Sequence, residues 1–209
     1  SRELPVTTGG RNQHLTMKGN FKRLWDSPTL RFIVLGGMMY TLSSIQGSIE
    51  ALRSVNTVAH FTHFTVAHAH LGMYGFFTLV MFGAVYFVMP RVMDWEWPYP
   101  GLISLHFWLV TVGFGIYFVG LSIGGWLQGL AMLDATRPFM DSVNVTIPWL
   151  KSRSVGGAIM ALGHVVFAVD EGGVRRLRLR DPRFGRARRG VQRNGDGLQL
   201  LATHFLGVA

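Results

Sequence analysis

The chain has 209 residues, of which 49% are hydrophobic, 15% are charged and none is cysteine. Soluble domains carry about 25% charged residues, and several apolar stretches here are long enough to cross a bilayer. We therefore expect a polytopic membrane protein. The lack of cysteine excludes disulfides, iron–sulfur clusters, thiolate-ligated haem and covalently attached haem. The net charge of +9 does not indicate a nucleic-acid partner, because nine of the 20 basic residues lie in residues 170–209.

The composition divides the chain into three parts. Residues 1–28 are polar, lack the apolar core of a secretory signal, and are expected to lie in the cytoplasm. Residues 29–169 contain the apolar segments. Residues 170–209 are basic and show neither helical nor strand periodicity, so we interpret them as a disordered tail or the product of a shifted reading frame. Because the chain opens at Ser1 without methionine, we expect a piece of a longer protein.

The apolar segments predict an all-α integral membrane bundle with three clear spans and a fourth, incomplete one. The three clear spans are about residues 29–49, 58–89 and 101–133. Pro28 marks a plausible helix start, and Pro90 is expected to close the second span. A polar loop should follow over 134–153, and the fourth apolar segment, which begins near Ser154, is too short for a full span.

Glycines at four-residue spacings mark the third predicted helix. They are Gly120, Gly124, Gly125 and Gly129. Small residues at this spacing let a neighbouring membrane helix approach closely, so we expect these glycines to serve packing.

Basic residues gather before the first span and in the tail, which by the positive-inside rule places both ends in the cytoplasm. We expect a multi-pass protein of a bacterial-type inner (cytoplasmic) membrane. The second helix then begins at the outer side, where a cofactor would lie close to an external electron donor.

Two histidines, His68 and His70, interrupt the apolar run of the second helix. An ionisable ring inside a membrane is costly and therefore indicates a function. Residues two apart on an α-helix point about 200° apart, so one metal ion cannot take both rings. Two haem irons, each taking one axial histidine, fit this spacing. The alternative is a pair of buried histidines bonded to neighbouring carbonyls.

Four further histidines lie near or within the spans. His60 stands at the entrance of the second helix, where it could bond haem propionates or water, and His63 is interpreted as an ordinary interfacial residue. His106 and His164 are expected to be structural.

The runs SVNTVAHFTHFTVAHAHLGMYGFF and LISLHFWLVTVGFGIYFVGLSIGGWLQGL resemble subunit I of the haem–copper oxidases. Within that superfamily the chain is most similar to cbb(3)-type cytochrome c oxidases, over about residues 28–169. The resemblance implies a C-terminal fragment of a twelve-helix core.

The resemblance also implies roles for single residues. His68 would be the proximal ligand of the high-spin haem where dioxygen is reduced, His70 an axial ligand of the low-spin haem, and His60 a neighbour of the haem propionates. Two haems, of b type, are implied, together with copper whose ligands lie in earlier helices of the family. The implied partners are c-type cytochrome and other oxidase subunits, cytochrome c as donor, dioxygen and the lipid bilayer.

The implied function is that of a terminal respiratory oxidase, an oxidoreductase that reduces dioxygen to water and translocates protons. The fragment alone is expected to be inactive. One departure from the family is Gln46, where a glutamate is usual, with Glu50 one turn later. The large subunit of nitric oxide reductase, which uses non-haem iron, is an alternative. Alternatives of another class are a non-catalytic haem-bearing subunit or a transporter, which would show a broken helix near mid-membrane.

Overall fold

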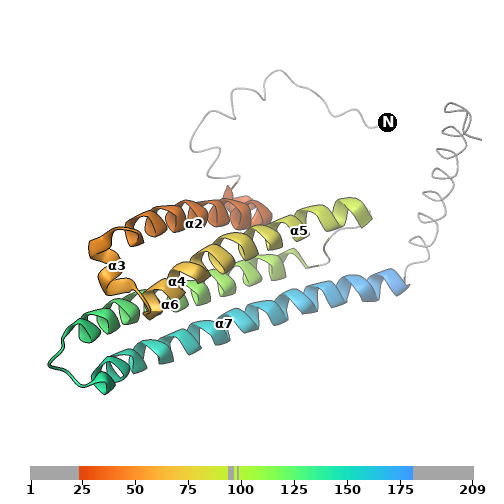
Figure 1. The fold of residues 1–209 in the computed structure, drawn as a ribbon. Helices are drawn as coiled ribbons and strands as arrows, with labels where there is room; N and C mark the ends of the chain where they lie inside the picture. Colours follow the sequence, from red (N-terminus) through yellow and green to blue (C-terminus); the bar gives the residue numbers. More distant parts are fainter. Residues whose placement is uncertain (1–23, 94–96, 98, 181–209) are drawn as a thin grey trace, which may run out of the picture. The chain divides into compact units, whose positions relative to one another are not determined.

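The computed structural model of the chain describes residues 24–93, 97 and 99–180, except the side chains of 174–180. The elements are α2 (Pro28–Glu50), α3 (Arg53–Ala59), α4 (His63–His70), the π-helix η3 (Leu71–Thr78), α5 (Leu79–Met93), α6 (Pro100–Leu133) and α7 (Phe139–Arg180). Residues 1–167 belong to one compact unit and 168–209 to another. The contacts described below lie within the first. α2, the α4–α5 rod and α6 lie side by side in it (Figure 1).

In the described part of the chain, four helical stretches are long and apolar enough to cross a membrane. They are Pro28–Glu50, His63–Val92, Pro100–Leu133 and Phe139–Gly173. The predicted all-α membrane class is confirmed, and the first and third spans agree with prediction to within a residue at each end. α2 begins where expected because the Ser27 hydroxyl accepts a bond from the Leu30 amide and Pro28 occupies the first turn.

The second span begins later than the sequence suggested. The chain breaks between α3 and α4, where Phe61 has a φ of 60°, a left-handed conformation that bulky residues rarely adopt. The Thr62 side chain then caps α4 by accepting a bond from the Phe64 amide, while its hydroxyl donates to the Ala59 carbonyl. The continuous helix over 58–89 is therefore wrong at its start, and His60 lies in the break.

The same span also runs past Pro90, to Met93. A proline inside a helix cannot donate to the carbonyl four residues earlier, which here belongs to Tyr86. Trp97 supplies the missing donor, because its Nε1 lies 3.0 Å from the Tyr86 carbonyl oxygen. This bond lets the helix continue where the sequence predicted its end.

A π-helix, η3, follows directly after His70. Its wider turn is visible at Thr78, whose hydroxyl donates to the Met73 carbonyl five residues earlier. π-Helical segments in membrane and soluble proteins are frequent at functional sites. The helix containing the histidine pair therefore changes its geometry immediately after the pair.

The glycines of α6 hold neighbouring helices close, as predicted. A side chain at Gly125 would overlap the backbone at Phe64, and one at Gly129 would overlap the Val58 carbonyl. On the side toward α7, a Cβ at Gly124 would lie 2.6 Å from the Trp149 Cβ. These glycines are therefore required for packing on two sides of α6.

The fourth helix is longer than predicted. α7 begins at Phe139, so the polar loop expected over 134–153 is wrong from residue 139 onward. Its polar side chains are compatible with a helix because they bond to its own backbone. Ser142 donates to the Phe139 carbonyl and Thr146 to the Val143 carbonyl. The predicted parts 1–28 and 170–209 lie mostly outside the described residues.

The turn between α6 and α7 is organised by Asp134. Its carboxylate accepts two hydrogen bonds from Thr136, one from the backbone amide at 3.1 Å and one from the hydroxyl. It also forms an ion pair with Arg137 at 3.0 Å. The bonds from Thr136, with a smaller contribution from Arg137, lower the pKa of Asp134. The carboxylate's stabilising effect is therefore present above its ordinary pKa and is lost as pH falls through the lowered value.

We expect acidification to break this turn locally. The amide proton of Thr136 should show a titrating NMR chemical shift whose midpoint lies below the ordinary range of aspartate. In Asp134→Asn, which keeps an acceptor oxygen but no charge, that titration should vanish; its persistence would assign the shift to another group.

Candidate functional site

The start of α4 is fastened to α6 by a glutamine that the sequence reading did not single out. Gln128 Oε1 accepts bonds from the His63 backbone amide at 3.0 Å and from the His63 Nδ1 at 2.6 Å. His63 is therefore an anchor of the helix. The sequence feature that could have indicated this role of Gln128 is a single amide side chain in an apolar, glycine-rich stretch of α6.

Replacing Gln128 with leucine should destabilise the bundle by about 1–3 kcal/mol, because half-buried His63 loses two hydrogen bonds, each worth about 0.5–1.5 kcal/mol. Thermal unfolding in detergent would measure the loss. Gln128→Glu keeps an acceptor oxygen and should retain most of the stability. Equal melting of Gln128→Leu and the parent would contradict the anchoring role.

His68 points toward α2. A Cβ added at Gly47 would lie 3.0 Å from its Cε1, so the absence of a side chain there makes room for the ring. The Nδ1 is buried without a hydrogen bond and lies 3.9 Å from the Glu50 carboxylate. The side chain keeps 30% of its exposure. Within the described part of the chain, Nε2 makes no hydrogen bond.

Glu50 is held in place from two sides. Its carboxylate accepts a bond of 2.8 Å from the Thr65 hydroxyl, and its backbone carbonyl accepts one from Asn56. Only 8% of the residue is exposed. The carboxylate therefore lies buried beside the His68 imidazole, in the position from which a carboxylate can orient a histidine; the sequence had indicated no contact between the two.

His70 points toward α6. Its Nδ1 lies 2.8 Å from the Val66 carbonyl, a bond in which only the nitrogen can donate. This bond fixes the tautomer and leaves a lone pair on Nε2. The Tyr117 hydroxyl lies 3.0 Å from that Nε2 and donates to it. Tyr117 was also missed by the sequence reading, because one tyrosine in an apolar helix carries no pattern.

The two rings therefore diverge, as their spacing predicted. His68 faces α2 and His70 faces α6, and in each ring Nδ1 is the nitrogen directed at a protein oxygen. His60 is separate from both, exposed in the break, with its ring 3.9 Å from that of Phe61. Among the described residues no group of three or more histidines and acids could hold a metal ion. The described histidines of this helix therefore stand as separate, single imidazoles.

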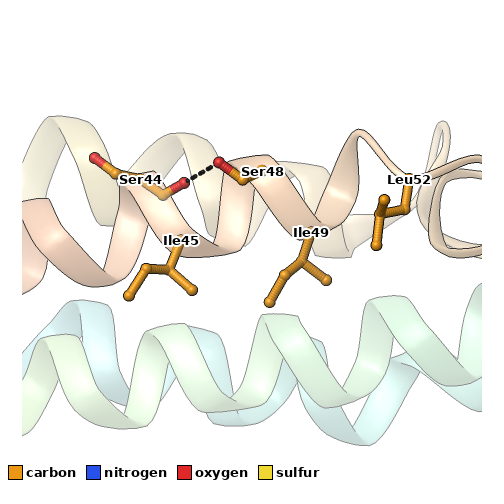
Figure 2. A pocket seen from close by; sticks show the side chains of 5 residues that line it. All are labelled: Ser44, Ile45, Ser48, Ile49 and Leu52. Atoms are coloured by element: carbon orange, nitrogen blue, oxygen red, sulfur yellow. Dashed lines mark hydrogen bonds between the residues drawn. The ribbon is translucent and has the colours of Figure 1, made fainter.

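The outer surface of α2 also carries a shallow recess (Figure 2). Ile45, Ile49 and Leu52 project to one side of it, and the Ser44 and Ser48 hydroxyls donate to carbonyls of their own helix. The recess presents apolar surface without a titratable group. It therefore supplies no chemistry, and the candidate site remains the histidine helix.

Comparison with known proteins identifies the family. Residues 3–159 match the family model for cytochrome c and quinol oxidase polypeptide I. The chain belongs to the haem–copper oxidase subunit I family. The cbb3-type cytochrome c oxidase subunit CcoN1 of Stutzerimonas stutzeri is 34% identical over 171 residues, which cover 78% of this chain and 36% of that protein. Cytochrome c oxidase subunit 1 of Rhodobacter capsulatus is 31% identical, covering 79% and 32%.

A nitric oxide reductase chain of Stutzerimonas stutzeri is more distant, at 25% identity over 133 residues, with 60% of this chain and 28% of that protein covered. A solved haem–copper terminal oxidase dimer has the same fold, with a TM-score of 0.57 and 21% identity over 68% of this chain and 26% of that one. The chain thus spans about a third of the length of its oxidase relatives.

Membership of the haem–copper oxidase family implies haem and copper as cofactors of the complete subunit. The described residues fit haem, since two histidines present separate imidazoles within one membrane helix. They do not by themselves form a copper site, which needs several ligands. The expected resemblance, the oxidoreductase family and the multi-pass membrane location are all confirmed.

Proposed function

We propose that this chain is the haem-binding part of the catalytic subunit of a cbb(3)-type terminal oxidase. In the complete enzyme it takes electrons from cytochrome c to a low-spin haem on His70 and then to a high-spin haem–copper centre on His68. There dioxygen is reduced to water, coupled to proton translocation. The low-spin and high-spin haems are of b type.

The observation that carries this proposal is the divergence of the two imidazoles. The His70 Nδ1 bonds the Val66 carbonyl and the His68 Nδ1 lies 3.9 Å from the Glu50 carboxylate, so in each ring Nε2 is the nitrogen that would bind an iron, for His70 after Tyr117 releases it. An imidazole that is already oriented through one nitrogen loses less conformational entropy when its other nitrogen binds a ligand. Only Ala69 separates His68 from His70, so both cofactors would be bound by the same rigid helix.

The residues around the pair would prepare each cofactor for its task. Haem supplies the one-electron chemistry when it is bound. Glu50, whose carboxylate lies 3.9 Å from the His68 Nδ1, would orient the ring and increase the basicity of Nε2 if the two groups close to hydrogen-bond distance when the haem binds. On the other side, Tyr117 must give up its bond to the His70 Nε2 for that nitrogen to reach an iron. His60 in the break would contact a propionate.

The remaining parts of the proposal follow from the spans and the basic residues. Both ends of the described bundle would face the cytoplasm of a bacterial inner membrane, which puts the start of α4 near the outer side. The other oxidase subunits, including c-type cytochromes, and cytochrome c would approach there. The unbroken span His63–Val92 does not support a transporter, because its neighbouring break lies before it rather than at mid-membrane.

The decisive experiment is haem and metal content of the full-length subunit purified from membranes. Two haems and one copper per subunit are the expected result. Two haems with non-haem iron would instead assign the chain to nitric oxide reductase, and absence of haem would reject both.

A further inference from the structure

A second group of titratable side chains lies within the bundle, away from the histidine pair. It consists of His106 on α6, His164 on α7, Tyr86 on α5 and Tyr74 in η3, which we call the imidazole–phenol cluster. The Tyr86 hydroxyl lies 2.9 Å from the His106 Nδ1, and the Tyr74 hydroxyl lies 3.2 Å from the His164 Nε2. The two imidazole centroids are 6.0 Å apart. Each histidine therefore has a tyrosine, and the two pairs adjoin.

His106 is the most constrained member of the cluster. It is 0% exposed, and Phe82 packs against its ring with centroids 4.5 Å apart. Its Nε2 is buried without a hydrogen-bond partner. A buried polar atom without a partner costs about 1–3 kcal/mol in a protein interior. The bond to Tyr86 uses only Nδ1, so the unused Nε2 indicates a second use for the imidazole.

The two tyrosines of the cluster are attached at different levels of the bundle. Tyr74 and Tyr86 are twelve residues apart on one helical rod, which at 1.5 Å per residue is roughly 18 Å, more than half of a bilayer core. Tyr86 lies at the end of the bundle where Arg31 bonds Ser104, and Tyr74 lies four residues after His70. The two imidazoles thus lie between that end of the bundle and the level of the histidine pair.

Among the described residues, few other charged side chains lie near the cluster. Arg31 is the charged side chain of α2 at this end, and its Cζ lies 5.2 Å from the Phe107 ring centroid. The elements packed on His106 otherwise present the aromatic rings of Phe32, Phe82 and Phe167. A proton arriving at the imidazoles would be stabilised chiefly by the two phenol oxygens and by negative charge elsewhere in the membrane.

We propose that the imidazole–phenol cluster is a proton-uptake site, which binds one proton from the cytoplasmic side when an electron reaches the low-spin haem. This inference rests on the proposed function. The incoming electron adds negative charge one helical turn from Tyr74, and a low-dielectric interior strengthens its attraction for a proton. The proton comes from water at the Tyr86 end and adds to an imidazole nitrogen, giving one imidazolium. No other bond changes, and the proton leaves when the electron moves on.

The test uses the complete oxidase, with the full-length subunit, in unbuffered detergent solution with a pH-indicating dye. On reduction of the low-spin haem, the parent enzyme should take up protons. His106→Gln and His164→Gln should lower the uptake to half or less, with haem bands unchanged. Tyr86→Phe, which removes only a hydroxyl, should slow the uptake at least tenfold. Tyr40→Phe is the matched control, because Tyr40 is 55% exposed on α2 and lies outside the cluster.

The outcomes separate the two proposals. A parent enzyme without haem would reject the proposed function. Haem-containing His106→Gln and His164→Gln enzymes with the parent's proton uptake would overturn the uptake site. Should either histidine variant fail to assemble, Tyr86→Phe decides, since unchanged kinetics would contradict the proposal. The pH dependence of the low-spin haem potential gives an independent readout, and it should flatten in the histidine variants.

Discussion

His70→Leu in the complete oxidase is expected to remove the low-spin haem while the high-spin haem remains, and His68→Leu to do the reverse. The reason is the divergence of the rings, one toward α6 and the other toward α2, which leaves neither able to replace the other. Turnover should fall by more than about a hundredfold in both variants, since loss of even an outer-shell partner costs 10–100-fold. Pyridine haemochrome content and reduced-minus-oxidised spectra would identify the haem that is lost.

The two variants serve as controls for each other, because each removes one imidazole from the same helix. Spectra in which both variants lose the same band would contradict separate partners for the two rings. Full haem content in both would mean that neither residue is a ligand.

The second large effect is expected at Gly125. A single methyl group in Gly125→Ala would overlap the backbone of α4 at His63 and Phe64, which cannot move aside as a flexible side chain could. Overpacking of this kind costs about 1–3 kcal/mol or more. The variant should therefore melt at a lower temperature, lose the α4–α6 contact and retain less haem.

Gly115→Ala is the matched control for this variant. It lies on the same helix, and a Cβ added there meets nothing within 4 Å. Alanine is also the better helix former, so Gly115→Ala should be neutral or slightly stabilising. Equal thermal stability of Gly125→Ala and Gly115→Ala would show that α4 does not approach α6 as closely as described.

Much of the fold could be predicted because membrane spans are set by length and apolarity. The spans at 28–50 and 100–133 and the packing role of the α6 glycines follow from those rules. The errors in the second span arose at two local features. Continuation through Pro90 depends on Trp97, and the break before α4 depends on Phe61 in a left-handed conformation. Neither has a periodic signal.

The candidate site, like the fold, could be predicted only in part. The opposite directions of His68 and His70 follow from helical geometry and needed no tertiary information. Their partners Glu50 and Tyr117 come from other helices, 18 and 47 residues away in the sequence, so only the packed bundle identifies them. Residues that far apart in the sequence have no preferred separation in space, so the sequence alone does not pair them.

The bonds of Gln128 to the His63 amide and ring have a mechanical consequence. Together with the backbone contact at Gly125, they prevent α4 from turning about its own axis at its first residue. A change in bilayer thickness can change the tilt of a membrane helix. With the Gln128 bonds and the Gly125 contact in place, it should not rotate α4 about its axis. His68 should therefore keep facing α2 and His70 α6 in thin and thick membranes, and in detergent as in lipid.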